Sequence, residues 1–171
     1  MLRNILQYPD ARLRTIARPV ASFDAELEQL VSDMLETMYH YDGVGLAATQ
    51  VDVHRQVVVI DVTDNRDQPL VFINPQIEVR DSSLTERRQE GCLSVPEVYD
   101  YVERPTDILV RYQDVKGETH SLTPDGLLAV CIQHECDHLR GRLFIDRLSQ
   151  LKRERITSRL GKASSRRKAR A

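Results

Sequence analysis

The sequence predicts a single α+β domain, in which a block of strands has helices before and after it. Two observations support this prediction. Apolar side chains recur at helical spacing over residues 27–38 and again over residues 127–138. Between them, residues 57–122 hold short β-branched or alternating runs separated by turn residues. We therefore expect small mixed, mainly antiparallel sheets packed around a central helix, with an N-terminal helix and a C-terminal helix.

The length and composition are those of a globular protein with a real core. The chain has 171 residues, of which 41% are hydrophobic. No apolar run approaches the roughly 18 residues of a membrane helix, and the first residues lack the apolar core of a signal peptide. The three cysteines, Cys92, Cys131 and Cys136, are too few for a disulfide framework. We expect a cytoplasmic protein with free thiols and no membrane contact.

The net charge of −2 conceals two oppositely charged parts. From Lys152 to the end there are nine basic residues and one acid, so this segment carries +8 and the rest of the chain −10. Such a tail favours an anionic partner, and a solvated helix with a frayed end is the alternative. We expect residues 1–150 to form the domain and residues 151–171 a basic C-terminal helix or tail.

The first half of the chain starts with an irregular arm, which holds one helical turn near residues 11–16. Asp24 is placed to cap the helix that follows, and Asp42-Gly43 ends it. Residues 57–62 are β-branched and apolar, which predicts a buried strand. After a turn at residues 65–69, a return strand covers residues 70–73 and ends at Asn74-Pro75, with a possible continuation over residues 77–80.

The second half opens on residues 81–89, whose polar character predicts a loop. Cys92 then follows Gly91 in what we expect to be a glycine-flanked loop. Residues 108–112 and 118–122 flank a turn and predict a hairpin. A second helix starts near residues 124–126 and ends at Gly141, and a third starts at Ser149.

The second helix carries Gln133-His134-Glu135-Cys136-Asp137-His138. His134 and His138 are four residues apart, so their rings lie one turn apart on the same helix face. Two imidazoles at this spacing can hold one divalent ion, and Glu135 can act as a general base. A polar helix surface without a metal is the alternative. On the first interpretation the central helix is a metal-binding helix.

A catalytic site of this kind usually has a third protein ligand. One protease pattern places a histidine where this chain has Phe144, and another takes a glutamate, for which Glu154 is the nearby candidate. Cys131 precedes His138 by seven residues, which is roughly 10 Å along a helix, and Cys136 points to another side than His134. Cys92 remains, and two imidazoles with its thiolate give a tetrahedral site with water in the fourth position. These ligand types alone favour zinc.

Three stretches of the chain resemble bacterial peptide deformylase. They are Gly43-Val44-Gly45-Leu46-Ala47-Ala48-Thr49-Gln50, Glu90-Gly91-Cys92-Leu93-Ser94, and Gln133-His134-Glu135-Cys136-Asp137-His138-Leu139. Their order and separations also fit, and so do Tyr8-Pro9-Asp10 with Leu13-Arg14, and Ile73-Asn74-Pro75. The resemblance covers nearly the whole chain and is least distinctive in the basic tail.

The resemblance implies an enzyme that removes the N-formyl group from the N-terminal formyl-methionine of nascent proteins and releases formate. One ion, Fe²⁺ in the family with Zn²⁺, Ni²⁺ or Co²⁺ able to substitute, would be held by Cys92, His134 and His138. A metal-bound water would attack, with Glu135 as general base and then acid. The side chain of Gln50 and the backbone N–H of Leu93 would bind the oxyanion.

The same resemblance implies the substrate-binding residues. The methionine pocket maps onto Val44, Leu127, Val130, Cys131 and the flank of His134. Gly45 would let the peptide approach as an added strand, and Glu90 would pair with Arg104 near Cys92. The chain departs from close relatives at Tyr99, where they often carry arginine, which leaves open how residues beyond the methionine are held.

The partners that follow are formyl-methionyl nascent peptides and, through the basic tail at residues 152–171, the ribosome. We expect a monomer. Within enzymes the alternative is a zinc-dependent peptidase that cleaves internal peptide bonds. From a different class, the metal would be structural and the chain a binding module, but a structural site usually has a fourth protein ligand.

Overall fold

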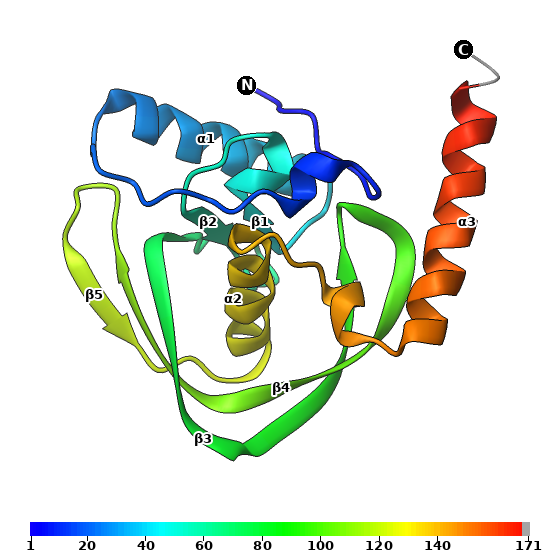
Figure 1. The fold of residues 1–171 in the computed structure, drawn as a ribbon. Helices are drawn as coiled ribbons and strands as arrows, with labels where there is room; N and C mark the ends of the chain where they lie inside the picture. The colour runs from blue at the N-terminus through cyan, green and yellow to red at the C-terminus, as the bar shows by residue number, and fades with distance from the viewer. Residues whose placement is uncertain (169–171) are drawn as a thin grey trace.

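The structure is a computed structural model that describes residues 1–168. Within them the chain forms one antiparallel five-stranded sheet with the strand order β1-β2-β3-β4-β5. Figure 1 shows this sheet with three α-helices. The strands are β1 (Gly45–Ala47), β2 (Val57–Ile60), β3 (Leu70–Cys92), β4 (Val95–Gln113) and β5 (Thr119–Leu122). The helices are α1 (Ala25–His40), α2 (Gly126–Leu139) and α3 (Gln150–Lys168), with short 3₁₀ turns at Ala11–Arg14, Ala48–Val51 and Phe144–Arg147.

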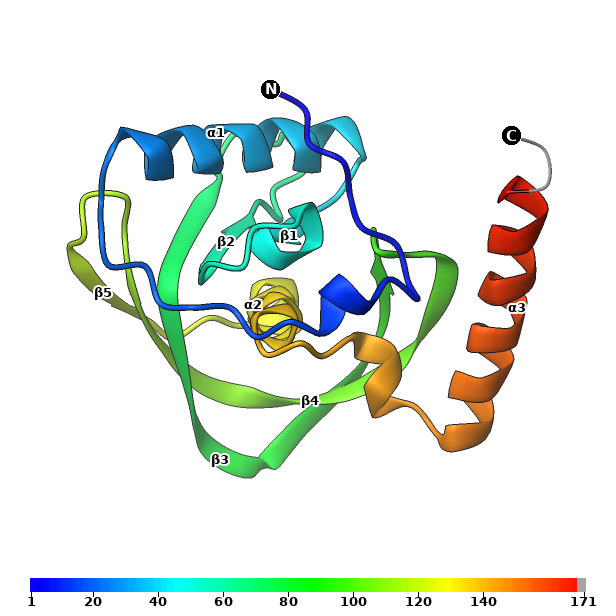
Figure 2. The ribbon, with the colours of Figure 1, turned by 45° about the horizontal axis from the view of Figure 1, so that its top comes forward.

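The central helix α2 lies between two parts of the bent sheet. In Figures 1 and 2 the long β3–β4 hairpin curves around one side of α2, while β1 and β2 lie on its other side, with α1 beyond them. Side chains of α2 are buried from Ala129 through Leu139. The expected α+β class is therefore confirmed, with all five strands in one continuous sheet. Among the described residues, no helix is long and apolar enough to cross a membrane.

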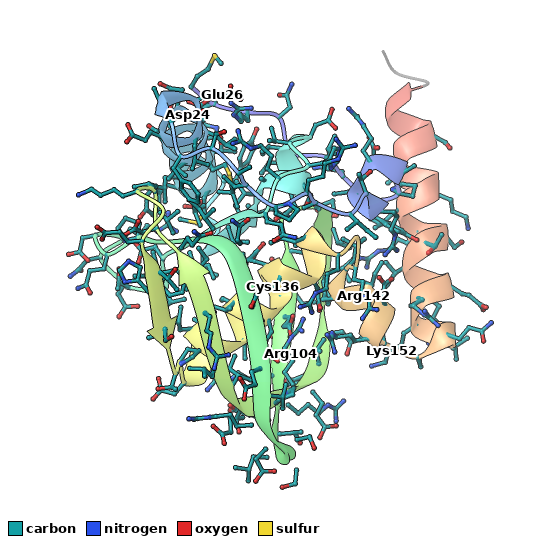
Figure 3. All side chains as sticks on the ribbon, turned by 60° about the vertical axis from the view of Figure 1, so that its left-hand side comes forward. Asp24, Glu26, Arg104, Cys136, Arg142 and Lys152 are labelled. Atoms are coloured by element: carbon teal, nitrogen blue, oxygen red, sulfur yellow. The ribbon has the colours of Figure 1, made fainter. Side chains whose placement is uncertain are left out.

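Helix α1 forms as its sequence predicts. The side chain of Asp24 accepts a hydrogen bond from the Leu27 backbone N–H at 3.0 Å, which caps the first turn (Figure 3). The apolar stripe then packs against β1 and β2, where Met34 and Met38 are completely buried. Both methionines are core residues, so α1 supports β1, the strand that carries Gly45.

The predicted loop at residues 81–89 is wrong, because these residues belong to β3 and pair with β4. The sheet also continues past Asn74-Pro75 through a register shift between Ile73 and Gln76. The sequence does not reveal this strand because most of its side chains from 81 to 89 are exposed, so no apolar alternation marks it. Backbone pairing with the neighbouring strand holds such a polar segment extended.

Cys92 is likewise not in a loop but is the last residue of β3. It pairs with Val95, so Leu93 and Ser94 form a two-residue turn outside the ladder. The turn is fixed by its neighbours, since the Ser94 carbonyl accepts a hydrogen bond from the Tyr8 backbone N–H at 2.8 Å. A strand end held on both sides positions a side chain better than a free loop would.

Asp61 follows β2 and connects the sheet to α1. Its buried carboxylate accepts hydrogen bonds from the Tyr39 hydroxyl at 2.7 Å, from the Thr63 hydroxyl at 2.6 Å, and from the backbone N–H groups of Thr63 and Gln68 at 3.0 and 3.2 Å. Burial raises the pKa of Asp61, but these donors outweigh burial and lower the pKa below its ordinary value. This carboxylate therefore stabilises the folded state in its charged form.

Helix α3 stands outside the sheet beside the Val95 end of β4, as both Figure 1 and Figure 2 show. Leu160 is buried in a cluster with Val95, Val98 and Phe144, and Ile156 packs against that cluster. The part of the basic tail that the structure describes is therefore attached to the body by apolar contacts. Residues 169–171 of the predicted tail lie outside the described residues.

Candidate metal centre

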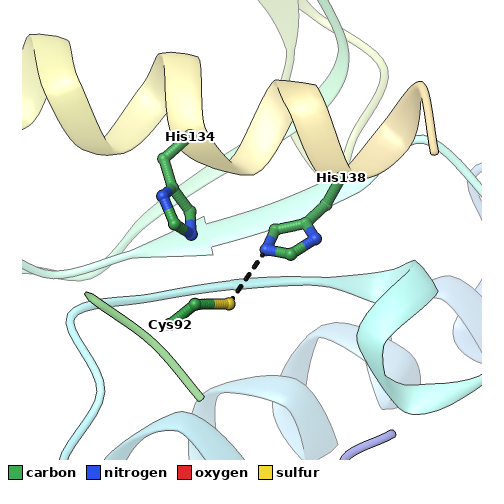
Figure 4. A group of neighbouring side chains, drawn as sticks. All are labelled: Cys92, His134 and His138. Atoms are coloured by element: carbon green, nitrogen blue, oxygen red, sulfur yellow. Dashed lines mark hydrogen bonds between the residues drawn. The ribbon is translucent and has the colours of Figure 1, made fainter. Parts of the chain in front are cut away.

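Helix α2 and the end of β3 bring together three side chains that could bind a metal ion. The rings of His134 and His138 project from one face of α2 toward Cys92 (Figure 4). One donor atom from each of the three residues lies within 4.8 Å of the others, and Cys92 Sγ is 3.3 Å from His138 Nε2. The structure thus joins a helix motif to a cysteine that lies 42 positions before it in the chain.

This donor set fits a divalent ion. A thiol that can ionise and two imidazoles are the ligands of zinc and of other first-row metals in tetrahedral sites. His134 is oriented through its other nitrogen, since Nδ1 is 2.8 Å from Glu90 Oε1. His138 Nδ1 is buried and has no hydrogen-bond partner among the described residues. Burial and the neighbouring His134 lower the pKa of His138, which favours the neutral imidazole that a metal needs.

The pKa of His134 is shifted in the opposite direction. Burial lowers it, but the hydrogen bonds with Cys92 and Glu90 outweigh burial and raise it above the ordinary value. Without an ion, the protein therefore favours a proton on the ring at this position. A bound cation would replace that proton, which gives metal binding a dependence on pH.

A buried ionic network supports Glu90. Arg104 is 1% exposed, and its guanidinium donates to Glu90 at 2.6 and 2.9 Å and to Asp137 at 3.0 Å. Asp137 also accepts two hydrogen bonds from Arg147 at 2.9 and 3.0 Å. Arg104 lies on β4 and Asp137 on α2, so this ion pair joins the hairpin to the helix. The Glu90–Arg104 pair was expected from the resemblance, whereas no sequence pattern indicated the roles of Asp137 and Arg147.

Glu135 is buried beside the cluster. Its Oε2 has no hydrogen-bond partner in the described part of the chain, and burial raises its pKa to about 7. On its other side it contacts β1, because a Cβ added to Gly45 would lie 2.5 Å from Glu135 Oε1. Gly45 is therefore required by the close approach of the strand to this carboxylate. A carboxyl group with a pKa near neutrality can both accept and donate a proton at working pH.

Two further residues, Gln50 and Leu93, line the cavity beside the cluster. The Gln50 side chain is held by the Ala47 backbone N–H, which donates to Oε1 at 2.9 Å. This directs Nε2 toward Ser94 Oγ at 3.0 Å and Cys92 Sγ at 3.5 Å. Leu93 lies in the turn after Cys92, so its backbone N–H has no partner in the strand ladder. No sequence pattern indicated a role for Ser94, whose hydroxyl accepts the hydrogen bond from Gln50 and holds the amide.

A cavity of about 490 Å³ opens at the cluster. Every residue that was predicted to bind substrate lines it, namely Val44, Gly45, Glu90, Leu127, Val130 and Cys131. Val130 and Cys131 are buried, whereas Val44 and Leu127 are more than two-fifths exposed at the mouth. Burial raises the pKa of Cys131 to about 12, so its thiol stays neutral. The cavity thus combines an apolar wall with polar groups at one end, as ligand sites commonly do.

Three residues considered for the third ligand position do not offer a donor atom to the cluster. Phe144 stacks on the ring of His134, with 5.9 Å between ring centroids, and so supports a proposed ligand by packing. Glu154 lies on α3, where it accepts a hydrogen bond from Gln150 at 2.9 Å. Cys136 is buried in the apolar core and is not among the three residues of the cluster.

Comparison with known proteins identifies the family. The family model described as polypeptide deformylase matches residues 2–154. The chain belongs to the peptide deformylase family. A curated peptide deformylase from Cellvibrio japonicus is 59% identical over 158 residues, which are 92% of this chain and 93% of that protein. One from Neisseria gonorrhoeae is 55% identical over 94% of this chain and 95% of its own length.

Solved peptide deformylase structures have the same fold. The crystal structure from Legionella pneumophila superimposes with a TM-score of 0.90 at 44% identity and covers 100% of this chain and 99% of that one. The Ehrlichia chaffeensis peptide deformylase in complex with actinonin gives a TM-score of 0.89 at 39% identity, over 95% of this chain and 97% of that one. Peptide deformylases are metal-dependent hydrolases that act on nascent formylated peptides, so neither the peptidase nor the binding-module alternative is favoured.

Proposed function

We propose that this chain hydrolyses the formyl amide of N-terminal formyl-methionine in nascent peptides and releases formate. The observation that carries the proposal is Glu135: its buried carboxyl group lines the cavity next to His134, and its Oε2 has no hydrogen-bond partner among the described residues. Cys92, His134 and His138 would hold one divalent ion. Such an ion supplies a Lewis acid that polarises a carbonyl oxygen and favours ionisation of water near neutral pH.

The residues around the cluster would then have separate roles in the hydrolysis. Glu135 accepts the proton of the attacking water and delivers it to the amine that leaves. The Nε2 group of Gln50 and the backbone N–H of Leu93 donate hydrogen bonds to the developing oxyanion, and loss of one such donor costs on the order of 10²–10³ in rate. Glu90, which also lines the cavity, would act through His134 by orienting its ring.

Substrate recognition follows from the cavity wall. Val130 and Cys131 form an apolar, polarisable surface that suits an unbranched thioether side chain. Gly45 lies on β1, which is the end strand of the sheet order and so has a free edge for an added peptide strand. These residues would bind the formyl-methionine and leave the following residues to the mouth of the cavity.

The direct test measures formate release from formyl-Met-Ala. Replacing Glu135 with glutamine keeps the size of the side chain but removes its base, so we expect kcat to fall by about 10³ or more. Glu154→Gln is the matched control on α3 and should keep wild-type activity and metal content. If metal-loaded wild type released no formate, or if it cleaved unformylated peptides instead, the proposal would be wrong.

We further propose Fe²⁺ as the working ion, with Zn²⁺, Ni²⁺ or Co²⁺ able to replace it. The support is the soft thiolate with two imidazoles, a set that accepts all four ions. Iron beside a thiolate is sensitive to oxidation. Metal analysis of anaerobically purified protein should find one iron per chain, and activity should fall in air. Equal activity in air at full iron occupancy would contradict the assignment.

We propose that residues 1–150 act as the single catalytic domain and residues 151–171 as a basic tail. We further propose that this tail contacts the ribosome. The excess of positive charge from Lys152 onward supports an anionic partner. Reversing the charges of Arg166, Arg167, Lys168 and Arg170 should weaken cosedimentation with purified ribosomes at low salt. The enzyme should keep its activity on formyl-Met-Ala, and unchanged cosedimentation would contradict the proposal.

We also propose that the chain works in the cytoplasm as a monomer. All three cysteines are free, which fits a reducing compartment. Sedimentation equilibrium should give a mass near the 19.7 kDa of one chain. A stable dimer would contradict the monomer.

A further inference from the structure

A second hollow adjoins the cavity. It lies between α3 and the first residues of β4, has a volume of about 340 Å³, and is lined by residues of both elements. Glu97 and Tyr99 line both this hollow and the cavity at the cluster. Figures 1 and 2 both show α3 standing beside this end of β4. The two spaces therefore adjoin, and a peptide that left the cavity across Glu97 and Tyr99 would meet the second hollow next.

Tyr99 forms the boundary between the two spaces. It pairs with Gly91 across the hairpin, and Gly91 precedes Cys92. The ring lies against that glycine, since a Cβ at position 91 would be 2.5 Å from the ring. Tyr99 is nevertheless 68% exposed. An exposed aromatic ring held in place by the backbone beneath it is the type of surface that a bound peptide covers.

The α3 side of the hollow carries positive charge. Lys152 pairs with Asp100 at 2.9 Å, and Arg159 donates to the Glu97 carbonyl at 2.9 Å. Arg155 also lines the hollow and has no hydrogen bond or ion pair within the described residues. The two engaged cations are already held in place, whereas the guanidinium of Arg155 is available to a ligand. Guanidinium groups recognise carboxylates through paired hydrogen bonds.

We propose that this hollow binds the part of the substrate beyond the methionine, and that Arg155 selects peptides with an acidic side chain there. The proposal rests on the proposed function. The occupant is the substrate itself, because the hollow adjoins the cavity and shares Glu97 and Tyr99 with it as lining residues. A nascent peptide is much longer than the cavity, so its later residues must leave across this rim or another.

The test uses neutral formylated octapeptides that begin with formyl-Met-Ala and carry a single glutamate, moved from the third to the eighth position. Each is compared with its glutamine counterpart at low salt. We expect one position at which glutamate raises kcat/KM about fivefold, as for a partly exposed ion pair. Arg155→Glu should remove this preference. Tyr99→Ala should lower kcat/KM more for octapeptides than for formyl-Met-Ala.

Arg153→Glu is the matched control, because Arg153 lies on the same helix but lines a different hollow. It should keep the preference for glutamate. If Arg153→Glu and Arg155→Glu had equal effects, or if no position preferred glutamate, the inference would be overturned. The inference would also be overturned if Arg155→Glu weakened binding of labelled polyuridylate while peptide kinetics stayed unchanged, because the second hollow would then bind RNA. A wild type that released no formate from formyl-Met-Ala would instead overturn the proposed function, and this inference with it.

Discussion

Replacing Gly45 with alanine would place a methyl group where the Glu135 carboxyl group now lies. The added Cβ would be 2.5 Å from Oε1 and 3.1 Å from both Cδ and Cγ of Glu135. Contacts this short cannot persist, and three atoms of one side chain are involved. Because β1 is paired with β2 and packed against both α1 and α2, we expect Glu135 to move rather than the strand.

The size of the effect follows from this displacement. Relieving the contacts needs a shift of about 1 Å, and a misplacement of that size commonly costs about 10²-fold in rate. We therefore expect kcat for formyl-Met-Ala to fall about 100-fold, which equals about 2.7 kcal/mol in activation free energy. The crowding should also lower the free energy of unfolding by about 1–3 kcal/mol.

The assay compares kcat, metal content and urea unfolding of Gly45→Ala with those of Gly161→Ala. Gly161 lies in α3, and a Cβ there would meet nothing within 4 Å. The control should keep wild-type kcat and gain about 0.5–1 kcal/mol in helix stability. A folded, metal-loaded Gly45→Ala enzyme with wild-type kcat would refute the reasoning, because Glu135 would then not need its present position.

Three more predictions follow from buried charges. Arg104→Met should lower the free energy of unfolding by about 3–5 kcal/mol, because it leaves the carboxylates of Glu90 and Asp137 buried without their shared partner. Glu90→Gln should weaken metal affinity about 10–100-fold, measured by competition with a chelator, because a carboxylate no longer orients His134. Asp61→Asn should lower the free energy of unfolding at neutral pH, and by progressively less in acid. The folded-state pKa of Asp61 is lowered, so the stability that its charge contributes is present above about pH 4. That stability is lost as the pH falls through the lowered pKa.

Each of these has a control and an outcome that contradicts it. Arg111→Met is the control for Arg104→Met, because it breaks an ion pair in which both side chains are at least half exposed. It should lower the free energy of unfolding by less than about 1 kcal/mol. If Arg104→Met lowered the free energy of unfolding by no more than this control, the role of burial would be refuted. Unchanged chelator competition in Glu90→Gln would show that His134 is oriented without the carboxylate. For Asp61→Asn, a stability difference from wild type that stays constant from neutral pH to below about 4 would show that the charge is not responsible.

Local sequence patterns by themselves determined those helices and strands that bury one face in the core. The stripe of α1, the cap at Asp24, the hairpin between β4 and β5 and the two histidines of α2 could all be predicted, because a 3.6-residue or two-residue period records which side meets the core. Helix geometry also left Cys92 as the remaining cysteine ligand candidate. Hydrophobic periodicity did not predict the strand at residues 81–89. Most side chains there are exposed, so no apolar alternation marks the segment, while backbone pairing with β4 holds it extended.

Only the tertiary structure decided what surrounds the candidate ligands. Local spacing cannot tell that Arg104 joins Glu90 to Asp137 in a buried network, or that Ser94 holds the amide of Gln50. Nor can it tell that Gly45 lies against Glu135 or that Tyr99 separates two adjoining hollows. These contacts join residues that are far apart in the chain, and their energies depend on burial, which arises only when the sheet has folded around α2.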